Sequence, residues 1–264
     1  MINEKNKIAK AFDNKNKKAF IAFLTAGDPD KESTIRYVLE MEKAGADLIE
    51  IGIPFSDPTA EGVVIQDANI RALKNGMTTD GVFEIVEEVR KVSNIPLCFM
   101  TYVNPVFHYG YERFFSRCEA LGVDGIIIPD CPYEEKAEVE EVAQAHNVAL
   151  ISMIAPTSEA RIKSIASEAK GFIYVVSSMG VTGVRSEIKT DLAAIVKSIK
   201  EVTDVPCAIG FGISTPEQAA KMAAVSDGSI VGSAIVKIIA ANGNKADQAL
   251  AEYVKSMKAA VEQV

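Results

Sequence analysis

Eight short apolar runs recur along this chain of 264 residues, and stretches with helical spacing separate them. The runs are rich in Ile, Val, Leu and Phe and are apolar at nearly every position, which is typical of strands covered on both faces. They predict eight strands, which are residues 19–25, 48–53, 96–102, 125–130, 149–155, 172–177, 206–212 and 229–233.

The stretches between these runs carry apolar residues three and four positions apart, which predicts helices with one buried face. A final amphipathic helix is predicted from about Lys245 to the end, and a short helix begins before it, near Ser233. An extra N-terminal helix is expected over about Glu4–Phe12. The clearest helices between strands are residues 31–46, 79–92, 111–122, 134–146 and 192–202.

Strands that alternate with helices through short loops imply parallel pairing. Eight such units in about 250 residues fit a (β/α)₈ or TIM barrel, and we expect residues 1–264 to form this one domain. The N-terminal helix is then placed to close the lower end of the barrel. An open doubly wound sheet is the main alternative, but the first strand runs into TAGDP and not into a GxGxxG phosphate loop.

Three helix-to-strand connections share a pattern in which a small or apolar segment is followed by Asp and then by a strand. They read KAGADLIE, ALGVDGII and AAVSDGSIV. This pattern is typical of short αβ loops, in which Gly or a small residue ends the helix.

The charge and the cysteine and histidine positions exclude several classes of function. The formal net charge is −8 and there is no Lys/Arg-rich block, so nucleic-acid binding is not expected. The four cysteines form no CxxC pair, and the two histidines, His108 and His146, have no metal-ligand spacing, so no metal site is predicted. No apolar run approaches a membrane span, and the polar N-terminus lacks a secretory core, which favours a cytoplasmic protein.

Glu50 is the most unusual residue of the second predicted strand. Alternate strand residues point to opposite faces, so Ile49, Ile51 and Ile53 suit the helices while Glu50 points into the barrel. Burying an ionised carboxylate without a partner costs several kcal/mol. A structural hydrogen-bonded Glu is one interpretation; a catalytic acid with a pKa raised by desolvation is the favoured one.

Glycines at the ends of the last strands predict a phosphate site. GFGIS and GSAIV place Gly212, Gly232 and Ser233 where loops seven and eight of a TIM barrel often bind phosphate. Glycines allow close backbone approach, and the N-terminus of a helix directs N–H groups at anions. Tight turns without a ligand are the alternative interpretation.

In this order and spacing, the motifs EIGIPFSDPTAEG, SSMGVTG, GFGIS and GSAIV resemble the alpha-subunit family of tryptophan synthase. The resemblance covers essentially the whole chain. It implies a lyase that cleaves indole-3-glycerol phosphate to indole and glyceraldehyde 3-phosphate by a retro-aldol reaction, with no cofactor in this chain. It also implies a beta-subunit partner that carries pyridoxal phosphate and receives the indole, in an alpha2-beta2 heterotetramer.

The resemblance assigns proton transfer at indole carbon 3 and at the side-chain hydroxyl to Glu50, and the indole N–H proton to Glu61. It places Tyr174 near the bond that breaks, where it orients Glu50; a core tyrosine with a satisfied hydroxyl is the alternative. The sequence has AEG where the family most often has ADG, so the second carboxylate lies about one CH₂ farther from the backbone than usual.

The remaining expected site residues fall into two groups. The substrate-binding group comprises indole-pocket walls, a loop threonine that helps to close the site, and a phosphate cradle: Phe23 and Met100, Thr182, then Gly183, Gly212, Gly232 and Ser233. The partner-contact and loop-closure group comprises Asp57, Pro58, Asn104, Pro105 and Asp130. Three alternatives remain open: a stand-alone lyase that releases indole, a largely non-catalytic activator of the beta subunit, and another phosphate-binding barrel such as a sugar-phosphate isomerase.

Overall fold

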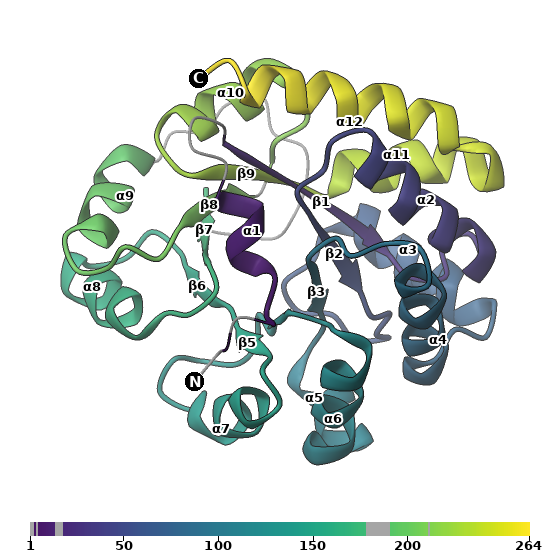
Figure 1. Ribbon diagram of the computed structural model, residues 1–264, viewed down its shortest axis with the longest axis horizontal. Coiled ribbons are helices and arrows are strands. Elements are labelled where there is room, and N and C mark those ends of the chain that lie inside the picture. The colour runs from purple at the N-terminus through teal and green to yellow at the C-terminus, as the bar shows by residue number, and fades with distance from the viewer. Residues whose placement is uncertain (1–2, 4, 14–17, 178–190, 211) are drawn as a thin grey trace.

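The strands form a closed ring of parallel pairs surrounded by helices (Figure 1). The computed structural model describes residues 3, 5–13, 18–177, 191–210 and 212–264. The sheet order is β5-β4-β3-β2-β1-β9-β8-β7-β6. Because β5 and β6 follow one another in the chain, the two edges of the sheet meet and the ring closes. The predicted TIM barrel is confirmed.

The described strands agree with the eight predicted runs, with one difference. The fifth run divides into two short strands on either side of Ile151, whose N–H still donates to the Ile126 carbonyl at 2.9 Å. The strands are β1 (Ala19–Thr25), β2 (Leu48–Gly52), β3 (Leu97–Met100), β4 (Gly125–Ile127), β5 (Ala149–Leu150), β6 (Ser152–Ile154), β7 (Ile173–Val176), β8 (Cys207–Gly210) and β9 (Gly228–Val231).

The described helices include all the clearly predicted ones, usually shorter by a few residues. They are α1 (Ile8–Phe12), α2 (Lys31–Lys43), α3 (Val63–Lys74), α4 (Thr79–Arg90), α5 (Val103–Tyr109), α6 (Tyr111–Leu121), α7 (Ala137–Ala145), α8 (Glu159–Glu168), α9 (Leu192–Lys200), α10 (Pro216–Ala224), α11 (Ser233–Asn242), η1 (Gly243–Lys245) and α12 (Asp247–Val261). No described helix is both long and apolar enough to cross a membrane.

Helix α5 follows the third strand directly, over residues where the sequence predicts no helix. The prolines and asparagine of TYVNPV are typical of turns, yet Pro105 occupies the first turn of α5. A proline is tolerated there because its missing N–H has no partner within the helix in any case. The partner-contact residues expected at 104 and 105 are therefore on a helix.

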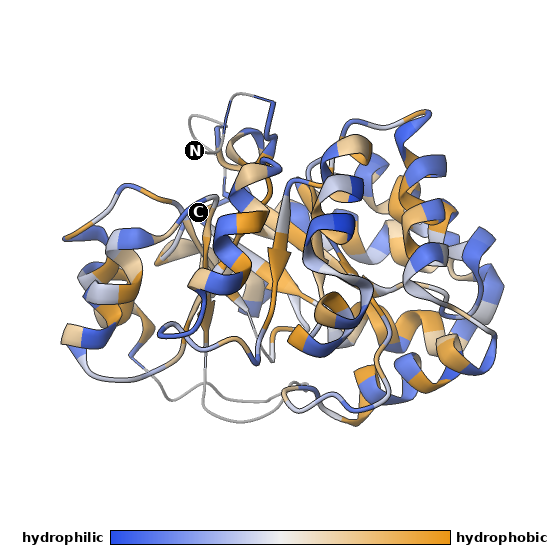
Figure 2. Cartoon of the chain, turned by 90° about the horizontal axis from the view of Figure 1, so that it is seen from below, coloured by the Kyte–Doolittle hydropathy of each residue, from blue (hydrophilic) through white to orange (hydrophobic). Residues whose placement is uncertain are grey.

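The core has an inner layer within the ring and an outer layer between strands and helices. Ile49 and Ile51 of β2 belong to the outer layer and Leu48 to the inner one, as alternation along the strand predicts. The apolar positions accordingly gather on the strands and on the inward faces of the helices (Figure 2).

Helix α1 closes the N-terminal end of the ring, as the sequence analysis expected. Its Ile8 is fully buried and belongs to the inner layer. The ring of Phe12, at the end of α1, lies 5.8 Å from the ring of Phe172, which directly precedes β7. In Figure 1 the helix lies across the middle of the ring of strands.

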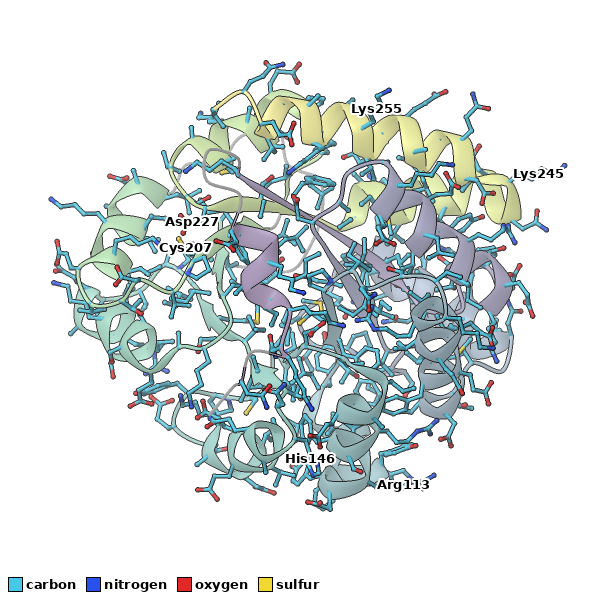
Figure 3. All side chains as sticks on the ribbon, in the orientation of Figure 1. Arg113, His146, Cys207, Asp227, Lys245 and Lys255 are labelled. Carbon is cyan, nitrogen blue, oxygen red and sulfur yellow. The ribbon has the colours of Figure 1, made fainter. Side chains whose placement is uncertain are left out.

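The same end is held together by the aspartates of the three repeated connections. Each carboxylate accepts a hydrogen bond from the main-chain N–H at or near the start of the preceding strand, so each ties the two ends of one β–α unit. The pairs are Asp47 with Phe20 (2.7 Å), Asp124 with Leu97 (3.0 Å) and Asp227 with Cys207 (2.8 Å), and Figure 3 labels the last of these.

Candidate active site

Glu50 lies inside the ring, where strand alternation placed it. It is next to Phe23 of β1 and Cys98 of β3 in register, and only 1% of it is exposed. Its Oε1 has no hydrogen-bond partner among the described residues. Burial raises the pKa of Glu50 from 4.5 to about 8, because the charged form loses its hydration and gains no cation. The group is therefore mostly protonated at neutral pH and can donate a proton.

A small cavity of about 30 Å³ brings Glu50 together with several other predicted residues. Tyr174 of β7, Phe23 of β1 and Met100 at the end of β3 line it with Glu50. Tyr174 is 95% buried, and burial together with the nearby charge of Glu50 raises the pKa of its phenol. The hydroxyl therefore stays protonated beside the Glu50 carboxyl.

Two glycines make room for the aromatic walls of this cavity. A Cβ on Gly52 of β2 would lie 2.8 Å from the ring of Phe23, which is closer than real contacts allow. A Cβ on Gly210 of β8 would likewise collide with the ring and hydroxyl of Tyr174. Each ring lies against a glycine of the neighbouring strand, so the inner layer alternates large and small residues next to Glu50.

Glu61 is held by hydrogen-bond donors from two other elements. It lies just before α3, is 7% exposed, and its Oε2 accepts from the Asn69 amide at 2.8 Å. The Tyr102 hydroxyl is also hydrogen-bonded to this carboxyl. Burial raises the pKa of Glu61 to about 7, while the bonds from Asn69 and Tyr102 oppose the rise. About half of this group is therefore ionised at neutral pH.

The two acids do not line the same cavity in this structure. Glu50 lines the small cavity, and Glu61 does not. Ile65, four residues after Glu61 in the first turn of α3, does line it. Within the described chain neither acid has a basic partner. Asn69 and Tyr102 were not among the predicted site residues, because their relation to Glu61 depends on how α3 and the end of β3 pack.

Two of the predicted phosphate-binding glycines lie together at the small cavity. Gly212, Gly232 and Ser233 all line it. Gly212 has a left-handed φ of 78°, and Gly232 is the N-cap of α11. Gly232 has no side chain with which to cap α11, and the N-terminus of a helix directs N–H groups at anions. Thr182 and Gly183 lie outside the described residues.

The expected partner-contact residues lie on the same side of the barrel as the ends of β2, β3 and β4. Asp57 and Asn104 are exposed, while Pro58 and Pro105 are half-buried. Asp130, after β4, accepts a hydrogen bond from the Val103 N–H at 2.9 Å and so fixes the start of α5. This contact gives Asp130 a structural role beside the predicted one in loop closure.

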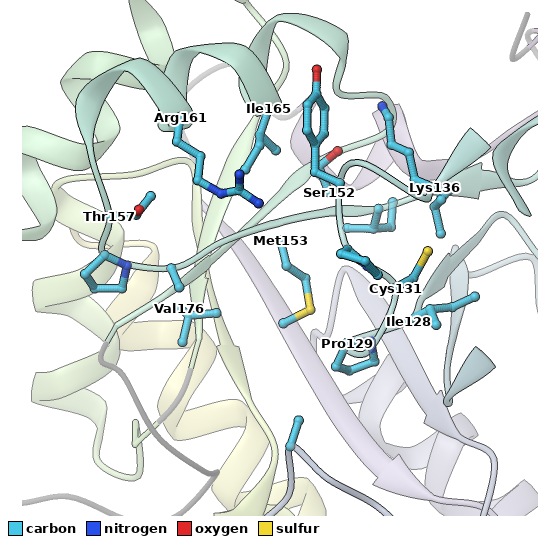
Figure 4. A pocket seen from close by; sticks show the side chains of 17 residues that line it. Ile128, Pro129, Cys131, Lys136, Ser152, Met153, Thr157, Arg161, Ile165 and Val176 are labelled. Atoms are coloured by element: carbon cyan, nitrogen blue, oxygen red, sulfur yellow. The ribbon is translucent and has the colours of Figure 1, made fainter. Parts of the chain in front are cut away.

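A second, larger cavity of about 450 Å³ is lined by neither acid (Figure 4). The loops after β4 and β6 form much of it, and its lining includes Pro129, Met153, Val176, Lys136 and Arg161. Glu50 and Tyr174 line the smaller cavity and not this one. Met153 was not predicted, although it lies in the inner layer at the end of a predicted strand.

The described residues contain no cluster of three or more His, Cys, Asp or Glu side chains placed to hold a metal. They form a TIM barrel in which two buried carboxylates have no basic partner among the described residues. Both lie toward the C-terminal ends of the strands, where the active sites of such barrels are found. This arrangement is typical of enzymes that use carboxylic acids for proton transfer.

The family model for the tryptophan synthase alpha chain matches residues 9–263, and the chain belongs to this family.

Individual relatives agree over nearly the whole chain. The tryptophan synthase alpha chain of Lacticaseibacillus casei is 49% identical over 257 residues, which cover 97% of this chain and 96% of that protein. The crystal structure of the alpha chain from Legionella pneumophila subsp. pneumophila superposes with a TM-score of 0.88 at 36% identity and covers 98% of both chains. A Pyrococcus furiosus chain from a study of mutual activation of the tryptophan synthase a2b2 complex has a TM-score of 0.83 at 37% identity, over 91% of this chain and 98% of that one.

Proposed function

We propose that this chain cleaves indole-3-glycerol phosphate to indole and glyceraldehyde 3-phosphate, as the alpha subunit of a tryptophan synthase, and that Glu50 is its principal acid–base group. The observation that carries the proposal is the buried Glu50 carboxyl, whose Oε1 has no partner among the described residues. A protein retains such a group only where it has a use, because unpaired burial lowers stability.

Glu50 transfers two protons in the proposed reaction. In its protonated form it donates a proton to carbon 3 of the indole ring, which converts the ring into a leaving group. The resulting carboxylate then accepts the proton of the side-chain hydroxyl as the carbon–carbon bond breaks and the aldehyde forms. Glu50 is protonated again at the end, so it completes the cycle unchanged. A pKa of about 8 suits both steps at neutral pH.

Glu61 serves the ring nitrogen. As a carboxylate it accepts the indole N–H proton while carbon 3 is protonated, and it returns this proton when the ring leaves. Electron density from the nitrogen makes protonation of the carbon feasible. The extra CH₂ of Glu61 is accommodated because Asn69 and Tyr102 hold its carboxyl. Tyr174 orients Glu50 from across the small cavity.

Phosphate and indole bind on opposite sides of Glu50 in this proposal. Gly212, Gly232 and Ser233 receive the phosphate at the start of α11, joined by Gly183, while Phe23 and Met100 contact the indole ring and Thr182 helps to close the site. In this proposal the loops around the small cavity close over the bound substrate. Such closure is common in barrels of this kind.

The partner in this proposal is a tryptophan synthase beta subunit in an alpha2-beta2 assembly, which receives the indole. Asp57, Pro58, Asn104 and Pro105 form the contact, and Asp130 supports it by fixing the start of α5. This chain uses no cofactor of its own, and pyridoxal phosphate belongs to the beta subunit. We place the protein in the cytoplasm and treat residues 1–264 as one domain.

Indole formation from indole-3-glycerol phosphate tests the proposal, with and without the beta subunit. Wild type should form indole, and Glu50→Gln should lower the rate by at least about a thousandfold, since acid–base catalysis and positioning are both lost. Glu61→Gln should lower it by about a hundredfold or more. Glu252→Gln, an exposed carboxylate on α12, is the matched control and should leave the rate unchanged.

Other outcomes identify the alternatives. A wild type that is inactive but stimulates the beta subunit, equally with Glu50→Gln, is a non-catalytic activator. Full activity without the beta subunit and no stimulation by it indicates a stand-alone lyase. No indole under any condition, with the beta subunit present, indicates a different phosphate substrate.

A further inference from the structure

Tyr102 is a buried titratable residue that the reaction described above does not use directly. It follows β3, is only 1% exposed, and is among the largest fully buried side chains. Its ring packs against Phe55, with ring centroids 5.5 Å apart. Its hydroxyl lies between the Ala60 main-chain N–H, at 3.1 Å, and the Glu61 carboxyl. A single side chain just after β3 therefore contacts three residues of the segment between β2 and α3.

The direction of these hydrogen bonds follows from the groups involved. The Ala60 N–H can only donate, so the Tyr102 oxygen accepts from it. The hydroxyl has one proton, and the carboxylate of Glu61 can only accept, so that proton points at Glu61. Burial and the charge of Glu61 raise the pKa of Tyr102, which keeps the donor protonated at every pH where the enzyme works.

Glu61 is consequently held by two neutral donors, Asn69 and Tyr102, with no cation among the described residues. Neutral donors stabilise the carboxylate less than a cation does, so the group still titrates near neutral pH. They also fix where the carboxylate points. The side chain of Glu has one more rotatable bond than that of Asp. The two donors therefore restrict more side-chain freedom here than they would for an Asp.

Tyr102 also lies between the two segments expected to meet the partner, the loop after β2 and the start of α5. On one side, Phe55 and Ala60 flank Asp57 and Pro58 in the sequence. On the other, Tyr102 is the N-cap of α5, whose first turn contains Asn104 and Pro105. A displacement of either loop therefore changes the position of the Tyr102 hydroxyl relative to Glu61.

We propose that Tyr102 is a positioning residue that sets the place of the Glu61 carboxyl and links it to the loops that meet the partner. The proposal rests on the proposed function, in which Glu61 accepts the indole N–H proton. Tyr102 touches no reacting atom; it acts through Glu61. Its loss should therefore change the reaction only where Glu61 is present.

The variant Tyr102→Phe keeps the ring contact with Phe55 and removes the hydroxyl. We expect kcat to fall about tenfold, with KM changed less than about twofold, because one hydrogen bond to a charged group is lost. The acidic limb of the pH profile should move upward by about one pH unit, since the carboxylate loses a donor. Stimulation by the beta subunit should also decrease.

Two comparisons separate positioning from a loss of structure. In a Glu61→Gln background, Tyr102→Phe should change kcat less than about twofold; an undiminished tenfold loss would overturn the proposal. Tyr37→Phe is the matched control, because Tyr37 is a fully buried tyrosine whose hydroxyl accepts from the Ala246 N–H, remote from the site. It should lower the melting temperature without moving the acidic limb.

A titration that needs no turnover separates this proposal from the proposed function. With ¹³C-labelled glutamate, the Glu61 carboxyl resonance, assigned by its absence in Glu61→Gln, should titrate about one pH unit higher in Tyr102→Phe than in wild type. An unmoved midpoint overturns the link between Tyr102 and Glu61, whether or not the protein forms indole. Failure of wild type to form indole overturns the proposed function and leaves the result of the titration standing.

Discussion

The two ends of the barrel hold their carboxylates in opposite ways. At the N-terminal end, Asp47, Asp124 and Asp227 each accept a main-chain N–H and each have a basic side chain close by. At the other end, Glu50 and Glu61 have no basic partner among the described residues. The same functional group stabilises the fold at one end and is kept free to exchange protons at the other.

The cations at the N-terminal end come from different elements. Lys258 of α12 lies 2.7 Å from Asp47, and Lys200 of α9 lies 2.7 Å from Asp227. Asp124 has two longer contacts, to Arg90 at 3.5 Å and to Lys7 at 3.8 Å. Burial raises the pKa of Asp47 and Asp124 too, but these N–H groups and cations oppose it. Asp124, at 2% exposed, is buried as deeply as the two glutamates, so its partners and not its depth set it apart from them. Asp47 and Asp227 are half-buried, so they differ from the glutamates in both respects.

The comparison predicts the largest loss of stability at the N-terminal end. Asp124→Ala removes the acceptor of the Leu97 and Lys7 N–H groups and leaves Arg90 without the buried carboxylate with which it pairs. The free energy of unfolding should fall by about 3–5 kcal/mol in urea titrations. Asp204→Ala, at an exposed position, should change it by less than about 0.5 kcal/mol.

Activity per folded molecule should survive Asp124→Ala, because this residue lies at the opposite end from the site. If activity per folded molecule falls as far as with Glu50→Gln, the division of roles between the two ends is wrong. A loss of stability no larger than that of Asp204→Ala would contradict the structural role of Asp124.

The pH dependence of kcat/KM tests the other end. Glu61 acts as a base and is ionised above its pKa of about 7, whereas Glu50 acts first as an acid and is protonated below its pKa of about 8. Activity should therefore form a narrow bell, falling about tenfold per pH unit below about 7 and above about 8. Glu61→Gln should remove the acidic limb and leave the basic one. A profile that is flat from about pH 5 to about pH 9 would exclude both assignments.

The smallest predicted effect concerns the most exposed pair of the N-terminal end. The side chains of Lys200 and Asp227 are 35% and 33% exposed, so water and salt screen their attraction. Lys200→Met should cost less than about 1 kcal/mol, and less still in about 1 M NaCl. Lys258→Met should cost more, since Lys258 and Asp47 are only 10% and 20% exposed. The reverse order would show that burial does not determine the strength of these pairs.

Much of the fold and one half of the acid pair could be predicted from local sequence. Alternation within a single strand was enough to place Glu50 inside the barrel, because the residue and its environment belong to one element. The pattern of Asp before a strand was visible too. The structural role of these aspartates could not be predicted from the pattern. Each one accepts a hydrogen bond from the start of the preceding strand, some twenty or more residues away.

The surroundings of Glu61 could not be predicted for the same reason. Asn69 comes from the buried face of α3 and Tyr102 from the end of β3, and only the packed barrel brings them to one carboxyl. Helix α5 was missed because Asn and Pro in its first turn are also typical turn residues. The break at Ile151 has no counterpart in the apolar pattern of its strand.

The unfolding free energy of wild type and Glu50→Gln, measured from about pH 5 to about pH 8, tests most directly whether Glu50 is buried without a stabilising partner. The pKa of Glu50 is about 8 in the folded state against an ordinary value of 4.5, so the unfolded chain releases this proton first. Stability from the protonated group is present below 4.5 and is lost as the pH rises toward 8. Wild type should lose up to about 1.4 kcal/mol per pH unit relative to Glu50→Gln across this window. Two curves that stay parallel would contradict the account, because Glu50 would then be ionised and stabilised like the aspartates at the other end.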